Sequence, residues 1–465
     1  MTRLETVLRG GHVVLGDGSV ADLDIGIVGG KIGALASRNS LGDAGQVVDI
    51  NGLTVLPGVI DAHIHLGHGA DITRPRAASD ADTETASAAA GGVTTFISYV
   101  IASDPYEEGI FEDIKSVSER GARIDFGFHL VISTEKQLAA IPVYVKTFGV
   151  ASFKLFMYNR GGEGARLGLP DIDDGFLYRL AEAAKSSGAI VCPHCENIEV
   201  AWVLRKRLMA ADPDGEGGLA AWSNSRPPFL EAEAVHRVST LARSLGARVH
   251  MVHCSSGEGL EASIAQRKLG APLTVETCTQ YLTHDVDWSG GIKAKVNPPV
   301  RAKADIEALW AGIKAGTIDT VATDHVHRDI AAKTGGVWKA SPGFPGLETL
   351  LPVMLTEGYH KRQLSLGRIA ELLSANPARI MGCPTKGTIA VGKDADFAIV
   401  DLNAEWIADE KTMRSDAGFS IYDGWRFKGR VEHTLVRGNF ALRDRLLNDD
   451  AVGTGRYIYR SHGKS

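Results

Sequence analysis

The chain of 465 residues is longer than one ordinary compact core requires, so it predicts several domains or one large α/β barrel with an appendage. A net charge of −6 gives no electrostatic reason to expect nucleic acid or an anionic membrane as a partner, and no apolar run approaches the roughly 18 residues of a membrane span. Five cysteines, an odd number in so long a chain, argue against a disulfide framework and predict a reducing, cytoplasmic setting.

Short strand patterns occupy both ends of the chain, separated by Gly-rich and Asp-Gly turns that are typical of hairpins. The expected strands span 6–14, 23–28 and 31–35 near the start, and 386–389, 396–401 and 431–436 near the end. Two strand-rich ends around a different middle predict one small β-sandwich domain, formed by residues 1–57 and by residues 385–465, which include a C-terminal tail.

The first strand of the middle part is expected at Val59-Ile60, and His63 and His65 follow it. Residues two apart on a strand face the same side. Two neutral imidazoles at the end of a buried strand suit a divalent transition metal, and the alternative is a pair of surface histidines. Cys192 and Cys195 form a CxxC pair that no second pair completes, so we expect them to pack at a strand end.

Apolar strands and amphipathic helices alternate through the middle of the chain. The strands include 94–100, 126–131 and 189–192, and the helices include 177–187, 230–245 and 306–315. This alternation predicts parallel βα units that close into a (β/α)8 TIM-like barrel over residues 58–384. In such barrels the chemistry lies at the C-terminal ends of the strands.

Four further polar residues each follow an apolar run, as that rule requires: Lys154, His194, His253 and Asp324. Their spacing from His63 places the five positions at the ends of strands one, four, five, six and eight. Each of them alone is better explained as a satisfied core or rim residue. Their shared position at five strand ends favours one joint site.

The motifs around these residues are specific. They are Asp61-Ala-His63-Ile-His65, Ser152-Phe-Lys154-Leu-Phe-Met157, His194-Cys-Glu-Asn197, Val252-His253-Cys-Ser-Ser256, Thr323-Asp324-His325 and Asn297-Pro298-Pro299. In this order they resemble the cyclic-amidohydrolase branch of the amidohydrolase superfamily, which holds hydantoinases, dihydropyrimidinases, allantoinases and dihydroorotases. The likeness covers nearly the whole chain.

The resemblance implies two divalent metal ions, most simply zinc, although manganese also suits these ligands. The metal ligands it implies are His63, His65 and Asp324 for one ion, His194 and His253 for the other, and a carboxylated (carbamylated) Lys154 as the bridge. Electrostatics supports the modification, because a lysine ammonium beside a divalent ion is repelled by several kcal/mol even at an effective dielectric of about 20.

The resemblance also implies the reaction. A metal-bridging hydroxide attacks the carbonyl of a cyclic amide or ureide, with Asp324 as general base and then general acid, and the ring opens to a carboxylate. The implied catalytic residues are Asp324, Lys154 and Tyr158. A small-molecule substrate and a homo-oligomer, tetramer or dimer, are the expected partners.

The sequence departs from the family pattern at several positions. Hydantoinases carry an oxyanion-stabilising tyrosine five positions after the bridging lysine, where this chain has Asn159, so Tyr158 is the candidate for that contact. Gly67 stands where dihydroorotases carry an arginine, which disfavours that activity. The other substrate contacts implied are Asn297, Gly343 and His325. The pocket wall is expected from loops 66–70, 158–167 and 342–344, with His68 and His327 as further candidates.

Hydantoinase- or dihydropyrimidinase-type hydrolysis is the main prediction, and allantoinase or cyclic-imide hydrolase activity is the alternative within the class. A catalytically silent barrel scaffold is the non-enzyme alternative, and the six filled ligand positions disfavour it. A mononuclear deaminase on the same barrel has no use for a bridging Lys154.

Overall fold

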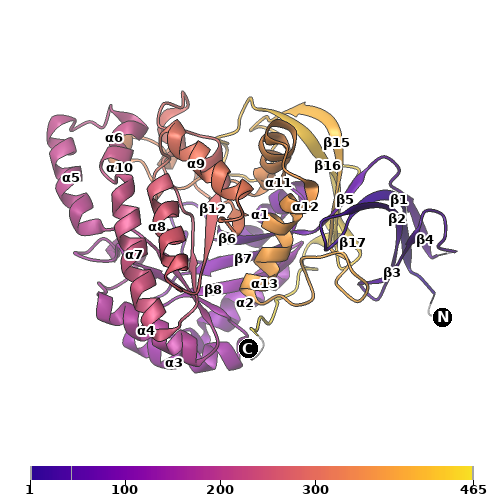
Figure 1. Ribbon diagram of the computed structural model, residues 1–465, viewed down its shortest axis with the longest axis horizontal. Helices are drawn as coiled ribbons and strands as arrows, with labels where there is room; N and C mark the ends of the chain where they lie inside the picture. Colours follow the sequence, from indigo (N-terminus) through magenta and orange to yellow (C-terminus); the bar gives the residue numbers. More distant parts are fainter. Residues whose placement is uncertain (1–2, 43, 463–465) are drawn as a thin grey trace.

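The computed structural model describes residues 3–42 and 44–462, which build two sheets (Figure 1). Parts of the predicted terminal segments, residues 1–2, 43 and 463–465, lie outside the described residues. The smaller part, at the right of Figure 1, is a sheet formed by both ends of the chain, and the larger part at the left is a helix-covered barrel.

The terminal sheet has nine strands in the order β18-β17-β16-β15-β5-β1-β2-β3, with β4 paired to β1. Their bounds are β1 Thr6–Val14, β2 Val20–Val28, β3 Lys31–Ser37, β4 Gln46–Asp49, β5 Thr54–Pro57, β15 Phe397–Ile407, β16 Arg426–Val436, β17 Asn439–Arg443 and β18 Leu446–Leu447. The two chain ends meet where β5 pairs antiparallel with β15, for example at Leu56 and Ala398. The predicted sheet domain from both termini is therefore confirmed, and its strands form one continuous hydrogen-bonded sheet around an apolar core of its own.

One predicted strand of this sheet is wrong: residues 386–389 are irregular, and the chain bends at Gly387 and Thr388. The ammonium of Lys386 is buried and donates hydrogen bonds to Asp125 (2.8 Å) and Asp396 (2.6 Å). Gly387 adopts a left-handed backbone with φ 87°. An extended conformation would withdraw the lysine from both carboxylates, and the apolar pattern alone does not reveal this pairing.

The barrel strands are parallel, in the order β13-β12-β11-β10-β9-β8-β7-β6-β14. Their bounds are β6 Val59–His65, β7 Val93–Val100, β8 Asp125–Val131, β9 Ser152–Phe156, β10 Ile190–His194, β11 Val249–Met251, β12 Leu273–Cys278, β13 Thr320–Ala322 and β14 His325–Val326. β13 and β14 are two halves of one interrupted strand: β13 pairs with β12, and β14 pairs with β6. The interrupted strand closes the ring, so the predicted eight-stranded barrel is confirmed.

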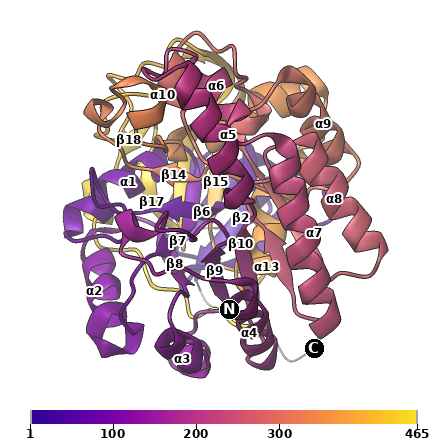
Figure 2. The ribbon, with the colours of Figure 1, turned by 90° about the vertical axis from the view of Figure 1, so that its left-hand side faces the viewer.

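Helices cover the outside of the ring, and in Figure 2 α2, α3, α4, α7 and α8 follow one another round the strands. The helices are α1 Ala78–Ala90, α2 Phe111–Gly121, α3 Glu135–Lys146, α4 Asp174–Ser186, α5 Ile198–Ala211, α6 Gly218–Asn224, α7 Pro228–Leu245, α8 Gly257–Lys268, α9 Lys303–Lys314, α10 Gly336–Lys339, α11 Leu350–Val353, α12 Leu366–Ala370 and α13 Asn376–Met381. The three helices expected from the sequence correspond to α4, α7 and α9. Within the described residues no helix is long and apolar enough to cross a membrane.

After β18 the chain leaves the terminal sheet and returns to the barrel. The amide of Ile458 donates to the carbonyl of Phe126 (2.7 Å), and Arg460, 1% exposed, donates to Ser152 Oγ (2.8 Å). The C-terminal segment around Ile458 and Arg460 therefore packs against β8 and β9 and stabilises both strands. We keep the domain boundaries 57/58 and 384/385 as a proposal, which the change of sheet between β5 and β6 supports.

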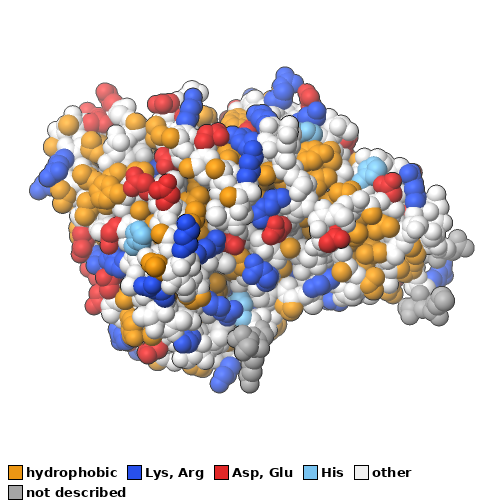
Figure 3. Space-filling model, viewed as in Figure 1, with side chains coloured by type: hydrophobic (Ala, Val, Ile, Leu, Met, Phe, Trp, Pro, Cys, Tyr) orange, Lys and Arg blue, Asp and Glu red, His pale blue; other side chains and the backbone are white. Residues whose placement is uncertain are grey.

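The surface shows no single-sign field on the face seen in Figure 3, where basic and acidic side chains are interspersed with apolar ones. The five cysteines are all unpaired and buried. Cys195 Sγ lies 3.7 Å from Met251 Sδ, which agrees with packing at a strand end.

Candidate metal centre

The barrel brings together six polar residues that lie far apart in the sequence. His63 and His65 lie on β6, Lys154 on β9, His194 at the end of β10, His253 two residues beyond β11, and Asp324 in the break between β13 and β14. These are strands one, four, five, six and eight, as expected. All six side chains are buried, and all line one cavity of about 60 Å³.

The distances show that the carboxylate of Asp324 lies among the imidazoles. Asp324 Oδ1 lies 3.2 Å from His63 Nε2 and 3.6 Å from His65 Nε2. The ring of His253 lies 5.1 Å from that of His63 and 4.5 Å from that of His194. The four rings and the carboxylate therefore form one compact donor cluster at the mouth of the barrel.

Two of these residues have a left-handed backbone, which non-glycine residues rarely adopt. The φ angle is 40° at His253 and 52° at Asp324. Such conformations persist where the surrounding structure over-determines them, and they cluster at functional sites.

The donor set fits divalent metal. Four buried imidazole nitrogens make no hydrogen bond of acceptable geometry to a described residue: His63 Nε2, His65 Nδ1, His194 Nε2 and His253 Nδ1. Two of them have a carboxylate nearby, since Asp324 Oδ1 lies 3.2 Å from His63 Nε2 and Glu196 Oε2 lies 3.5 Å from His194 Nε2. Buried polar atoms are almost always satisfied, so four such atoms in one cluster indicate a missing ligand. Neutral imidazole nitrogens together with a carboxylate are the ligands that zinc and similar ions prefer.

Lys154 lies inside this cluster with its side chain 1% exposed. Its Nζ lies 4.5 Å from the centre of the Tyr99 ring, and no described carboxylate forms an ion pair with it. Burial lowers the pKa of Lys154, and the attraction of Asp324 opposes that shift. A buried amine without a counter-ion, among histidines and a carboxylate, is unusual for a structural lysine.

Glu276 is a site residue to which the sequence analysis gave no role. It lies on β12, fully buried, and accepts hydrogen bonds from His63 Nδ1 (2.6 Å) and the backbone N–H of His253 (3.1 Å). Burial alone would raise the pKa of Glu276, but the attraction of His63 and His250 and their hydrogen bonds together outweigh burial and lower it. The bond fixes the proton of His63 on Nδ1 and leaves Nε2 free for a metal, a typical outer-shell arrangement. The sequence contains one indication of this role: Glu276 is the single acid in a strand whose other residues are apolar, threonine or cysteine.

Three of the predicted substrate contacts line the same cavity: Tyr158, Asn297 and Gly343. The ring of Tyr158 lies 4.7 Å from that of His194, and burial raises the pKa of its hydroxyl to about 12. At Gly343 an added Cβ would lie 2.7 Å from Val326 Cβ, so this wall requires glycine. Asn159 is buried beside the cavity and does not line it.

The structure corrects the predictions for three histidines. His325 Nε2 lies 2.9 Å from Glu84, and its Nδ1 accepts from the N–H of Gly346, so its ring faces away from the cavity. His68 and His327 also point away, to acidic partners. Their positions after strand ends gave no indication of these acids, which come from distant segments.

Of the three predicted wall loops, 158–167 and 342–344 contribute to the cavity and 66–70 does not. At Gly67 an added Cβ would lie 2.4 Å from the carbonyl oxygen of Asp71, so no side chain fits there. This explains in physical terms why the arginine of the dihydroorotase pattern is absent. Arg166 and Arg328, which the sequence analysis did not select, also line the cavity.

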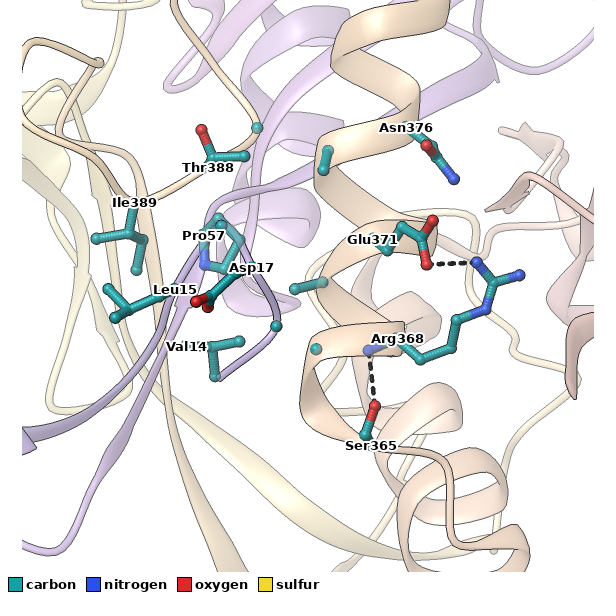
Figure 4. Close-up of a pocket in the computed structure, with 16 residues that line it drawn as sticks. Val14, Leu15, Asp17, Pro57, Ser365, Arg368, Glu371, Asn376, Thr388 and Ile389 are labelled. Carbon is teal, nitrogen blue, oxygen red and sulfur yellow. Dashed lines mark hydrogen bonds and ion pairs between the residues drawn. The ribbon is translucent and has the colours of Figure 1, made fainter. Parts of the chain in front are cut away.

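A second and larger cavity, of about 570 Å³, lies between the end of β1 and α12 (Figure 4). Its most prominent charged groups satisfy each other, with Arg368 donating to Glu371 at 2.6 Å. Ser365 caps α12 by accepting from the Arg368 amide (3.0 Å). This larger cavity contains none of the six clustered residues, so the candidate chemistry belongs to the smaller cavity at the strand ends.

The fold and the site together define a barrel enzyme whose strand ends are equipped to hold divalent metal. Residues 54–441 match the Amidohydrolase family. The chain is 34% identical to an allantoinase of Solibacter usitatus, over 93% of both chains, and 32% identical to a D-hydantoinase of Geobacillus stearothermophilus, over 99% and 97%. A solved dihydropyrimidinase from Brevibacillus agri superimposes with a TM-score of 0.88 at 30% identity and 98% coverage of both chains. The chain belongs to the amidohydrolase family.

Proposed function

We propose that this protein hydrolyses the amide bond of a cyclic amide or ureide, in the manner of a hydantoinase or dihydropyrimidinase. The observation that carries the proposal is the cluster of four unpartnered histidine nitrogens around Asp324 and Lys154. Relatives that carry the names D-hydantoinase, L-hydantoinase and dihydropyrimidinase, each matched over nearly the whole chain, support it.

Two divalent ions, most simply zinc with manganese as a second fit, would be held by two sets of residues. His63, His65 and Asp324 would hold one, His194 and His253 the other, and a carboxylated Lys154 would join them. When bound, such ions supply a hydroxide nucleophile at neutral pH and polarise the scissile carbonyl. The carbamate is favoured because the ammonium form of Lys154 would be repelled by the ions.

The remaining steps belong to the protein's own side chains. A carboxylate oxygen of Asp324 accepts the proton of the attacking water and delivers it to the leaving nitrogen. The hydroxyl of Tyr158 donates to the oxygen that becomes negative as the carbonyl is attacked. The amide of Asn297 and the backbone at Gly343 hold the ring, since both line the cavity.

Allantoin hydrolysis is the second candidate. Allantoinases of Solibacter usitatus and Deinococcus radiodurans are 34% and 36% identical to the chain over more than nine-tenths of its length. Allantoin carries a hydantoin ring, so the same attack on a ring carbonyl would open it. A silent scaffold is disfavoured, because scaffolds have no reason to keep four orphaned buried nitrogens.

The deciding experiment measures metal content per chain together with hydrolysis of hydantoin, dihydrouracil, allantoin and succinimide. We expect about two metal ions per chain and turnover of one of the first three rings. Lys154→Ala removes most of the metal and the activity. Full activity of that variant, or a wild-type chain that stays free of metal after reconstitution with bicarbonate, would overturn the proposal.

We further propose a homotetramer, on the resemblance to the cyclic amidohydrolases, and a cytoplasmic location. The location is supported by five unpaired cysteines, because secreted proteins usually pair theirs. Light scattering of the purified protein measures the assembly: a dimer mass would replace the tetramer by the smaller homo-oligomer, and a monomer mass would contradict the proposal.

A further inference from the structure

Arg328 is a buried cation in the cavity wall without a buried anion to balance it. It follows β14 and is 5% exposed. Its Nη1 donates to the carbonyls of Gly69 (2.8 Å) and Ala70 (3.5 Å), and its Nε donates to that of Pro342 (3.3 Å). Among the described residues no carboxylate forms an ion pair with it, and its Nη2 donates to none of them.

The surroundings make this charge costly. Lys295 and Lys333 contact the loop that forms this wall: the amide of Gly343 donates to the carbonyl of Lys295, and Lys333 Nζ donates to that of Ser341. Neither lysine forms an ion pair with a carboxylate in the part of the chain that the structure describes. Burial, with the repulsion of neighbouring cations, lowers the pKa of Lys295 to about 7 and that of Lys333 well below its usual value. Burial and the repulsion of Arg166 lower the pKa of Arg328 only to about 10, with the exposed Asp329 opposing the shift, so Arg328 stays charged at neutral pH. A buried charge without a partner is costly, and an anionic ligand repays that cost.

A second guanidinium reaches the same cavity from another loop. Arg166 belongs to the short helical turn Ala165–Leu167 after β9, is exposed, and forms no ion pair with a described carboxylate. The two guanidinium groups line the same cavity, and the repulsion of Arg166 contributes to the lowered pKa of Arg328. Asp324 is the sole carboxylate among the residues that line the cavity.

We propose that Arg328, assisted by Arg166, forms an anion subsite, and that the substrate is a cyclic amide whose ring bears a carboxylate side group. The inference rests on the proposed function and names its substrate class. Guanidinium suits this task because its planar fork pairs with a carboxylate through two parallel hydrogen bonds. The three hydrogen bonds to carbonyls hold Arg328 in place and leave Nη2 for the ligand.

The test uses two hydantoins of nearly equal shape, one with a carboxymethyl and one with a carbamoylmethyl group on the ring carbon. We expect the metal-loaded wild-type enzyme to show a kcat/KM at least about 10-fold higher for the carboxylate. Arg328→Met lowers kcat/KM for the carboxylate about 100-fold and lowers it much less for the amide. Arg328→Lys recovers part of the loss, since it keeps the charge and loses the fork.

Arg179→Met is the matched control, because it removes an exposed arginine that pairs with Glu135 on the helical surface. Calorimetric binding of both hydantoins to wild type and Arg328→Met separates the two proposals. Turnover of the amide as fast as the carboxylate, with equal binding of the two, overturns the anion subsite and leaves the hydrolase intact. Preferential binding of the carboxylate that Arg328→Met abolishes, without turnover of either ring, supports the subsite and overturns the hydrolase. Equal losses for both substrates in Arg328→Met reduce Arg328 to a structural role.

Discussion

Two neighbouring residues have different environments: Tyr158, the predicted oxyanion donor, and Asn159, which occupies the family's usual tyrosine position. Tyr158 lines the cavity, and its hydroxyl makes no hydrogen bond to a described residue. Asn159 is 1% exposed and sits against Gly164, outside the cavity. A hydroxyl with a pKa of about 12 stays protonated at neutral pH and can donate to a developing oxyanion.

We therefore expect Tyr158→Phe to lower kcat about 100-fold, as removal of one oxyanion donor does, with metal content unchanged. Asn159→Ala is the comparison and should lower kcat by less than about 10-fold. Steady-state kinetics on the preferred ring, with metal analysis of both variants, provide the measurement. A larger kcat loss for Asn159→Ala than for Tyr158→Phe would return the oxyanion role to the family's usual position.

The sequence identifies the residues that sit at strand ends, because strand periodicity and barrel geometry place them. His63 and His65 share a face by spacing alone, and Asp324 follows an apolar run. Glu276 and Arg328 escape such reasoning, since their importance lies in contacts across strands and loops. The direction of the His325 ring is hidden for the same reason: Glu84, its partner, lies 241 positions earlier on α1.

The break between β13 and β14 is the element that forms the active-site edge of the ring. Thr323 in the break donates from Oγ1 to Asp61 on β6 (2.6 Å) and accepts from the N–H of His325 (3.0 Å). Burial raises the pKa of Asp61 to about 6, against the hydrogen bond from Thr323. These two hydrogen bonds of Thr323 hold the interrupted strand beside β6 and fix the backbone conformation of Asp324, which lies between Thr323 and His325.

Thr323→Val keeps the shape and removes both hydrogen bonds. We expect it to lower the free energy of unfolding by about 2 kcal/mol, since it leaves buried groups unsatisfied, and to weaken metal binding through Asp324. Thr320→Val on the same strand is the matched control, because Thr320 Oγ1 is buried without a partner among the described residues. It should be neutral or up to about 1 kcal/mol stabilising. Urea unfolding measures the free energy of unfolding of both variants. Equal losses in the two would show that the hydrogen bonds of Thr323 do not stabilise the interrupted strand.

At the level of elements, apolar alternation is enough to predict the strands that pack on a core, such as β1 and β7. The interrupted eighth strand is harder, since its halves β13 and β14 have three and two residues and pair with different neighbours. The strand predicted for residues 386–389 is wrong because the buried ion pairs of Lys386 override the strand-like pattern of this segment. Pattern predicts where apolar surface is buried and does not predict where charges pair.

Over the whole molecule, the two sheets are coupled by a charged cluster beside the active site. The segment between β15 and β16 leaves the terminal sheet and reaches the barrel, where Asp416 Oδ1 lies 2.6 Å from His327 Nε2. Ser415 Oγ donates to Glu84 on α1 (3.2 Å). His68, in the loop after β6, lies 2.8 Å from Asp80 and 3.4 Å from Glu84, with its ring 3.9 Å from that of His327.

This cluster makes stability depend on pH above neutrality. Burial alone would lower the pKa of His68, but its hydrogen bonds with Glu84 and Asp80 outweigh burial and raise it to about 9. The His68 contribution is therefore complete below the unfolded value of 6.5 and is lost as pH rises towards 9. The pKa of His327 is lowered by burial and by repulsion from His68, so its effect falls below that window.

We expect the free energy of unfolding of the metal-loaded protein to fall between pH 6.5 and about 9. In this range each chain that unfolds releases up to one proton, the one that the native state holds on His68. His68→Asn removes that slope, because asparagine cannot carry the charge that pairs with the two acids. His12→Asn is the control: it removes a histidine beside Asp22 on the terminal sheet and keeps the cluster, so the slope persists. Urea titrations across the range measure the slope, and an unchanged slope in His68→Asn would place the titrating group elsewhere. Because Asp416 and Ser415 belong to the terminal part of the chain, loss of this charge also loosens the segment that joins the two sheets.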